Sequence, residues 1–229
     1  MSWWGTSEPE EVLYDELPTP EGEEAIRALG EEAVKEILEV FGSDDGWTEL
    51  PFEEEGHSDI KLFDKPDEGS EIVPVKAAGP INAPAEKVFN IFAEDDLEKL
   101  KATHDPDILE LEMLETFGDV TVRFSSFYVA AVVSNREFVY VQVNRKLDDG
   151  SYVMATKSIN RPGKKVVSGN VRGVVSLAGA QIVPDKEDPQ KCMVYRSVMV
   201  NPKGSIPGWV VNMSKSKCAQ KIVAVRGLV

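Results

Sequence analysis

The chain has few of the residues on which most metal and nucleophilic sites depend. Its 229 residues include two cysteines, Cys192 and Cys218, and two histidines, His57 and His104. No Cys/His spacing matches a zinc site, and two isolated cysteines do not make a disulfide framework. We therefore expect no metal, no cofactor and no catalytic residues, and a reducing compartment.

Long apolar runs are also missing. No stretch approaches the roughly 18 apolar residues that a membrane-spanning helix needs, and no run near the N-terminus resembles a signal peptide. These absences favour a cytoplasmic protein that meets membranes only at its periphery.

Basic residues are scarce at the start of the chain, and acidic residues are absent from its end. Residues 1–60 hold 19 acidic side chains against two basic ones, whereas residues 201–229 hold five basic side chains and no acidic one. A net charge of −15 argues against a nucleic-acid partner, because phosphate binding needs concentrated Lys and Arg. The basic end is either a solvated helix face or a surface for anionic lipids, which attract each nearby basic residue by about 1 kcal/mol.

The hydrophobic pattern predicts one α+β domain over residues 19–229, preceded by an acidic tail at 1–18. An amphipathic helix is predicted at about 20–41, with Thr19-Pro20 at its start and Gly42 at its end. The sheet and a closing helix are predicted within 47–228. The further elements expected are strands near 60–64 and 71–78, helices at 84–92 and 95–101, about six strands between 108 and 200, and a helix from Pro207. Strands that follow one another without helices between them indicate an antiparallel sheet.

The last helix has two apolar arcs. One arc comprises Val211, Cys218, Ile222 and Val225, and the other comprises Trp209, Met213, Val223 and Ala224. The helix is then either an ordinary core helix or a lid that grips the sheet or a ligand on one side and meets a membrane on the other. In the second case Lys215, Lys217 and Lys221 are the predicted membrane contacts.

Two segments carry a family resemblance. The run VSNREFVYVQ at 133–142 and the run NPKGSIPGWVVNM at 201–213 resemble signature segments of the START (steroidogenic acute regulatory protein-related lipid transfer) family. Further similar segments lie at Trp47, 60–63, 83–89 and 171–173, and His104-Asp105-Pro106 stands where the family often has Trp-Asp-Pro. The resemblance extends from about Trp47 to Leu228.

The resemblance implies a helix-grip fold, in which a curved antiparallel sheet surrounds a long C-terminal helix and leaves an internal apolar cavity. It also implies a monomer that binds one lipid and transfers it between membranes. Two alternatives remain: a lipid-sensing regulatory module without net transfer, and a cyclase-like or hydrolase-like enzyme that uses the same cavity.

The resemblance also places candidate site residues. Several family members carry an acid thirteen residues before the motif arginine and an arginine six residues after it. Counted from Arg136, these positions hold Arg123 and Gln142, so the family's sterol association does not carry over and an anionic headgroup, such as that of a phospholipid, becomes an option. Strand alternation adds Ser125 and Tyr140 to the predicted lipid-binding set, which Trp209 and Met213 complete.

Two of the arginines raise specific expectations. A cavity-facing Arg123 would pair with a ligand phosphate or carboxylate, whereas an outward-facing Arg123 would reach solvent or a surface acid. Arg136, which stands where its strand begins, is expected to fix the strand entry through hydrogen bonds; the alternative is a direct contact with the ligand.

Overall fold

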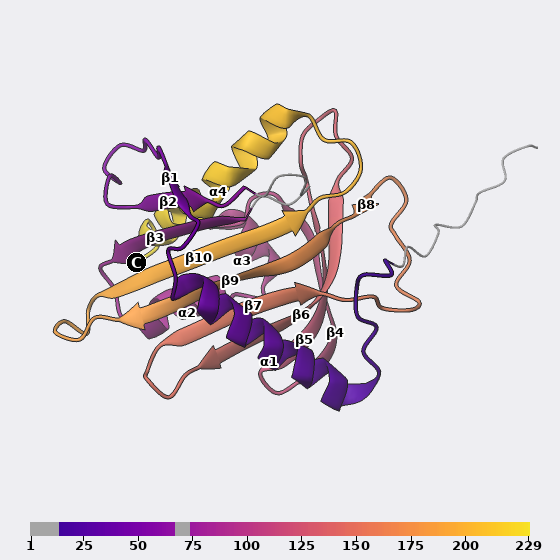
Figure 1. Cartoon of the computed structure of the whole chain (residues 1–229), viewed down its shortest axis with the longest axis horizontal. Helices are drawn as coiled ribbons and strands as arrows, with labels where there is room; N and C mark the ends of the chain where they lie inside the picture. Colours follow the sequence, from indigo (N-terminus) through magenta and orange to yellow (C-terminus); the bar gives the residue numbers. More distant parts are fainter. Residues whose placement is uncertain (1–13, 67–73) are drawn as a thin grey trace, which may run out of the picture.

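A computed structural model describes residues 14–66 and 74–229, without the side chains of 208–214. Its centre is one sheet of ten strands, in which the order is β1-β2-β3-β10-β9-β7-β6-β5-β4 and β8 pairs with β6 (Figure 1). All pairings are antiparallel except that of β6 with β8. The strands are β1 (Thr48–Leu50), β2 (Lys61–Asp64), β3 (Val75–Ile81), β4 (Ile108–Phe117), β5 (Val120–Phe127), β6 (Arg136–Lys146), β7 (Tyr152–Ser158), β8 (Val171–Arg172), β9 (Val174–Pro184) and β10 (Cys192–Asn201).

Helices lie on both faces of this sheet (Figure 1). On one face, α1 (Gly22–Phe41) packs on β5, β6 and β7, and Gly30 permits the close approach, because a Cβ there would lie 2.8 Å from Cγ2 of Val143. On the other face, α2 (Ala85–Phe92) and α4 (Gly208–Arg226) pack on β2, β3, β9 and β10. The short α3 (Leu97–Ala102) leads into β4. The predicted α+β helix-grip fold is confirmed.

Burial on both faces makes β5 and β6 unusual for an antiparallel sheet. Alternate residues such as Val122 and Val141 pack beneath α1, while their neighbours Arg123 and Tyr140 point to the opposite face. Strands covered on two sides lose the apolar-polar alternation of a half-exposed sheet. This explains why polar residues such as Arg123 are buried in the middle of a strand.

The first helix begins two residues after its predicted start, and the predicted N-cap, Thr19, is wrong. The helix begins at Gly22, and its N-cap is Glu21, which makes no side-chain capping bond. Gly22 has a φ of 79°, a left-handed conformation that interrupts the helical path between Pro20 and the first turn. The predicted end is confirmed, since Gly42 is the C-cap.

The other boundaries differ less. β3 begins at Val75 and not at 71, and residues 71–73 lie outside the described part of the chain. The two shortest strands, β1 and β8, were not predicted, because two or three residues are too few to show an alternating pattern. The predicted helices at 84–92, 95–101 and from Pro207 match α2, α3 and α4 to within two residues.

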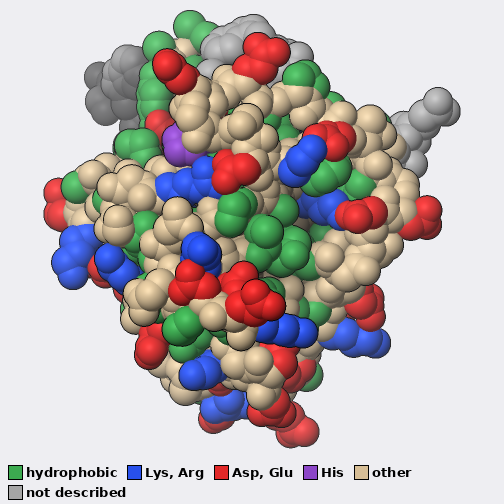
Figure 2. Space-filling view, turned by 90° about the vertical axis from the view of Figure 1, so that its left-hand side faces the viewer, with side chains coloured by type: hydrophobic (Ala, Val, Ile, Leu, Met, Phe, Trp, Pro, Cys, Tyr) green, Lys and Arg blue, Asp and Glu red, His purple; other side chains and the backbone are tan. Residues whose placement is uncertain are grey.

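Charges of both signs share the surface. Figure 2 shows Lys and Arg side chains interspersed with Asp and Glu around a small hydrophobic group on the side that lies at the left of Figure 1. This side of the molecule is therefore not uniformly acidic, although the chain has an excess of acidic residues.

Candidate functional site

A cavity of about 240 Å³ lies on the face of the sheet opposite α1. Its wall is drawn from β4, β5, β6, β7, β9 and β10, from the α2–β4 region and from α4. Most of the wall is apolar, and its larger side chains include Phe92, Leu100, Ile108, Phe127, Phe138 and Val198. Polar side chains reach the same space from several elements, so the cavity combines an apolar lining with a few polar groups.

The four polar residues predicted for the site, two from the family resemblance and two from strand alternation, all lie on the cavity wall. Arg123 and Ser125 come from β5, and Tyr140 and Gln142 come from β6. In the sheet Arg123 stands directly opposite Tyr140, so the two strands present one continuous polar stripe. Their contact with a lipid stays a prediction.

Arg123 both lines the cavity and has an acid partner. Its guanidinium pairs with the carboxylate of Asp95, and its Nε donates to Oγ1 of Thr121 at 2.7 Å. Arg123 is buried, whereas the side chain of Asp95 is 39% exposed. The charge of Arg123 is thus already matched within the protein, by an acid at the edge of the cavity.

Ser125 and Tyr140 bring hydroxyl groups into the cavity. The Oγ of Ser125 is fully buried, yet it makes no hydrogen bond of ordinary geometry within the described residues. Burial raises the pKa of Tyr140, and the nearby Ser125 hydroxyl and Arg123 charge oppose that rise. The Ser125 hydroxyl can therefore form a hydrogen bond with a ligand. Such a bond would recover part of the about 1–3 kcal/mol that a buried hydroxyl without a partner costs. Gln142, in contrast, already donates from Nε2 to Oδ1 of Asn144 at 3.0 Å.

A second polar group of the wall was not predicted as a site. It consists of His104 before β4, Arg196 on β10 and Lys221 on α4, with Asp105 beside them. The Nζ of Lys221 lies 2.6 Å from Oδ2 of Asp105. Burial, reinforced by the charge of Lys221, lowers the pKa of His104 to about 4, so its imidazole is neutral at neutral pH. The one signal in the sequence was a charged residue at position 196, between the apolar positions 194 and 198 of the same strand face.

The predicted lid residues of α4 divide into those that the structure describes and those that it does not. The side chains of Trp209, Val211 and Met213 lie outside the described part. Cys218, Ile222 and Val225 are buried against the sheet, as the first apolar arc predicts. Val223 of the second arc also packs against this core and is partly buried.

Each of the three lysines predicted to touch a membrane has an acid partner. Lys215 lies 2.8 Å from Asp64, and Lys217 lies 2.6 Å from Asp107. Lys221 faces the cavity and pairs with Asp105. Membrane contact by these residues stays a prediction.

Arg136 has the structural role expected of it. It is the first residue of β6, its Nε donates to the carbonyl of Pro202 at 2.7 Å, and its Nη2 donates to that of Lys203 at 3.0 Å. It also donates to the carbonyl of Ser134. Arg136 therefore joins the two sequence motifs, 133–142 and 201–213, at the loop that leads into α4.

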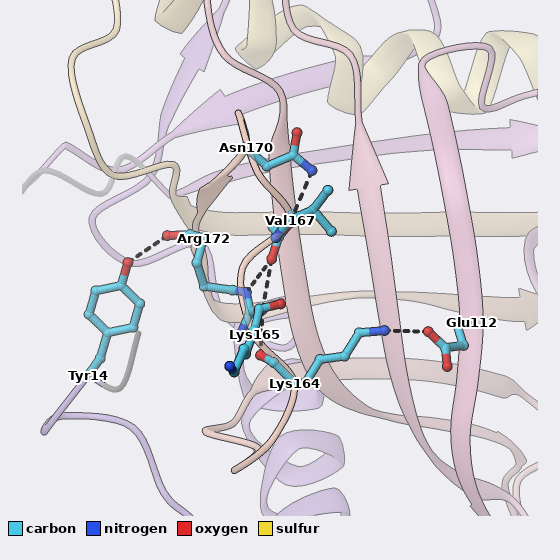
Figure 3. A network of polar contacts seen from close by, with 8 residues as sticks. Tyr14, Glu112, Lys164, Lys165, Val167, Asn170 and Arg172 are labelled. Atoms are coloured by element: carbon cyan, nitrogen blue, oxygen red, sulfur yellow. Dashed lines mark hydrogen bonds and ion pairs between the residues drawn. The ribbon is translucent and has the colours of Figure 1, made fainter. Parts of the chain in front are cut away.

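A buried ion pair close to Arg136 is fully bonded. Glu137 accepts from Nη2 of Arg172 at 2.7 Å, and its other oxygen accepts from the N–H of Val167 and from Nδ2 of Asn170, both at 3.0 Å. The hydroxyl of Tyr14 donates to the carbonyl of Arg172 at 2.7 Å, so the described end of the predicted tail contacts the domain (Figure 3). Glu137 is 0% exposed. This network closes the 161–173 loop over the sheet and leaves no group for a ligand.

Other chemistry is sparse in the described ranges. Residues 14–66 and 74–229 contain no group of three His, Cys, Asp or Glu side chains that could hold a metal ion. Burial raises the pKa of Cys192 to about 11 and also raises that of Cys218, so neither thiol is an activated nucleophile. Among the described helices, none is sufficiently long and apolar to cross a membrane.

Comparisons with known proteins agree with this architecture. The family model of the START domain matches residues 27–224. Steroidogenic acute regulatory-like protein 1 of Caenorhabditis elegans is 37% identical over 82 residues, which is 35% of this chain and 31% of that protein. Steroidogenic acute regulatory protein of Xenopus laevis is 26% identical over 192 residues, which is 82% of this chain and 65% of that protein. The chain thus spans less than two thirds of the length of either relative.

Solved structures show the same fold at low sequence identity. Human StAR-related lipid transfer protein 5 superposes with a TM-score of 0.76 at 16% identity, covering 89% of this chain and 96% of that chain. Human STARD10 superposes with a TM-score of 0.69 at 19% identity, covering 93% of this chain and 81% of that one. Because the family model matches most of the chain and the fold agrees, this chain belongs to the START domain family.

Proposed function

We propose that this protein binds one lipid in the cavity and transfers it between membranes. The observation that carries the proposal is the mainly apolar cavity bordered by the sheet, the α2–β4 region and α4. Each methylene held there and not in water is stabilised by about 0.8 kcal/mol, so the cavity offsets the cost of carrying an acyl chain or another extended apolar group out of a bilayer through water. The family supports this function, and the structure with a TM-score of 0.76 is that of a lipid transfer protein by name.

The polar groups of the wall support a lipid with an anionic headgroup, such as a phospholipid. The described wall carries Arg123, Arg196 and Lys221 among mainly apolar neighbours. Cations in a dry site form strong, charge-assisted hydrogen bonds with phosphate or carboxylate oxygens. In this proposal Ser125, Tyr140 and Gln142 contact the polar part of the lipid, and Trp209 and Met213 contact it from α4.

The proposal includes a transient membrane encounter. Residues 201–229 carry no acid of their own, and the partners of Lys215 and Lys217, Asp64 and Asp107, belong to other elements. Anionic headgroups can compete for these lysines, which would loosen α4 from the sheet at the membrane surface. We further propose that residues 19–229 form a monomeric domain that acts in the cytoplasm.

The decisive experiment has two stages. Native mass spectrometry of the purified full chain should reveal one co-purified lipid per protein. A transfer assay between donor and acceptor vesicles, at low and high salt, should then show protein-dependent transfer that salt weakens. Binding without transfer would favour a lipid sensor, and a chain that binds no lipid of any class would refute the proposal.

A further inference from the structure

Arg196 is the one cavity arginine that lacks a carboxylate partner in the described residues. It lies on β10 between Ala77 of β3 and Ala180 of β9, two small neighbours that leave its side chain room on the cavity face. Its backbone carbonyl is 3.6 Å from Sγ of Cys218, so α4 passes directly over this position. None of the ion pairs within 14–66 and 74–229 includes Arg196, although it is partly buried.

The polar residues that share this part of the wall with Arg196 are Lys221, His104 and Asp105, and the carboxylate of Asp105 is already paired. Lys221 takes the carboxylate of Asp105 at 2.6 Å. His104 faces the same space, with its Nδ1 3.1 Å from the hydroxyl of Thr103. Burial lowers the pKa of Lys221, Asp105 opposes this effect, and the charge of Arg196 adds to it. Two cations therefore share a corner of the cavity with one anion.

The remaining carboxylate of the wall does not supply the missing charge. Glu94 accepts hydrogen bonds from the N–H groups of Asp95 and Asp96 and lies 3.5 Å from Nζ of Lys99. Asp95 in turn is bound to Arg123. A partly buried charge without a counter-charge costs free energy, which an anion entering the cavity would recover.

Two further features narrow the kind of anion. The cavity, at about 240 Å³, is below the roughly 300–1,000 Å³ typical of pockets for drug-sized ligands, so one apolar chain fits better than two. The buried Ser125 hydroxyl, which makes no ordinary hydrogen bond in the described residues, offers a polar contact elsewhere on the same wall.

We propose that Arg196 and Lys221 bind the acidic group, a carboxylate or a phosphate, of a single-chain lipid. The corner that they form is a specificity site distinct from the stripe of Arg123, Ser125, Tyr140 and Gln142 on β5 and β6. This inference rests on the proposed lipid-binding function and adds the class of ligand.

The test compares matched single-chain ligands on the full-length protein. Oleate, oleoyl lysophosphatidate and oleyl alcohol share an eighteen-carbon chain and differ in the charge of the head. Titration below their aggregation concentrations should show the two anions binding about tenfold or more tightly than the alcohol. Oleate and lysophosphatidate separate a carboxylate ligand from a phosphate ligand. Vesicles of phosphatidic acid test for a two-chain ligand, which should bind more weakly.

Variants then assign the preference to the corner. Arg196→Gln should remove most of the preference for the anions and leave oleyl alcohol binding within about twofold. Arg196→Lys should retain most of it, and Arg27→Gln, which removes an arginine from the outer surface of α1, should change nothing. Circular dichroism and thermal unfolding establish that each variant is folded.

The outcomes separate the two proposals. Equal binding of oleate and oleyl alcohol by the wild-type chain, or an undiminished preference in folded Arg196→Gln, overturns the acidic-lipid inference and leaves lipid binding intact. Stronger binding of two-chain phosphatidic acid than of lysophosphatidate overturns the single-chain part. A wild-type chain that binds none of these lipids, and none of the neutral lipids in the mass spectrometry, overturns the proposed function as well.

Discussion

Two clusters of charged side chains lie on the sheet, and they differ in how fully they are bonded. Around Glu137 and Arg172, both carboxylate oxygens have donors, and the guanidinium has acceptors in Glu137 and in the carbonyl of Lys164. Around Arg196 and Lys221, the one carboxylate, that of Asp105, pairs with Lys221, and Arg196 has no carboxylate partner in the described residues. A saturated cluster holds segments of the chain together, whereas an unsaturated one bordering a cavity has capacity for a ligand.

The largest expected effect comes from breaking the saturated cluster. Arg172→Met leaves the fully buried Glu137 without its cation, and we expect a loss of about 3–5 kcal/mol in the free energy of unfolding. Urea denaturation measures this. Lys35→Met is the control, because its pair with Glu39 is 4.0 Å long and highly exposed, and it should change stability by less than about 0.5 kcal/mol. A similar small change in Arg172→Met would show that the network is not structural.

The next effect is a pH dependence that originates in the unsaturated cluster. In the folded protein the pKa of His104 is about 4, below its ordinary 6.5, so the unfolded chain binds this proton more readily. Lowering the pH from about 6.5 to about 4 should therefore reduce the free energy of unfolding, by about 1–3 kcal/mol from this residue.

The difference between wild type and His104→Gln isolates this contribution from that of the carboxylates. The variant should have a shallower dependence over the same pH range. Thr103→Ala keeps the imidazole and should keep the wild-type dependence. Identical pH profiles for wild type and His104→Gln would contradict the assignment.

A third prediction concerns Arg123, whose charge is matched by the carboxylate of Asp95. Asp95→Asn removes the carboxylate that pairs with Arg123 and so should raise the affinity for oleate about threefold to tenfold. Equilibrium titration measures it. Asp148→Asn removes the same charge from an exposed turn outside the cavity wall and should leave the affinity unchanged. Weaker oleate binding by Asp95→Asn would mean that Asp95 positions Arg123 and does not compete with the ligand.

The smallest expected effect concerns stability at the unsaturated cluster itself. Arg196→Gln in the lipid-free protein removes a cation that has no carboxylate partner in the described residues, so the free energy of unfolding should stay the same or rise by up to about 1 kcal/mol. Urea denaturation of delipidated protein measures it. A loss as large as that of Arg172→Met would show that Arg196 is structural and would remove the contrast between the clusters.

The sequence predicted the part of the site that follows from the family resemblance and from local periodicity. Positions counted from the motif arginine, Arg136, gave Arg123 and Gln142, and alternation along the two strands added Ser125 and Tyr140 to the same face. It did not predict the corner at Arg196, because His104, Arg196 and Lys221 meet only through the packing of three elements that are distant in the chain.

The same limit applies to partners and to some boundaries. Neither Asp95 as the partner of Arg123 nor Arg172 as the partner of Glu137 has a periodic signal, since each pair joins residues about thirty positions apart. The helix start was misplaced because Thr19-Pro20 has the composition of a helix start, while the backbone at Gly22 turns the other way.

The hydrogen bonds that Arg136 makes to the loop before α4 do not depend on the side chains of that loop. The guanidinium donates only to backbone oxygens, at Ser134, Pro202 and Lys203, and Lys203 holds a left-handed φ of 50°. The side chains at 202 and 203 take no part in these bonds. Substitutions there can alter the charge of the surface beside α4 and still keep the connection, provided that the replacement residues tolerate the same backbone path.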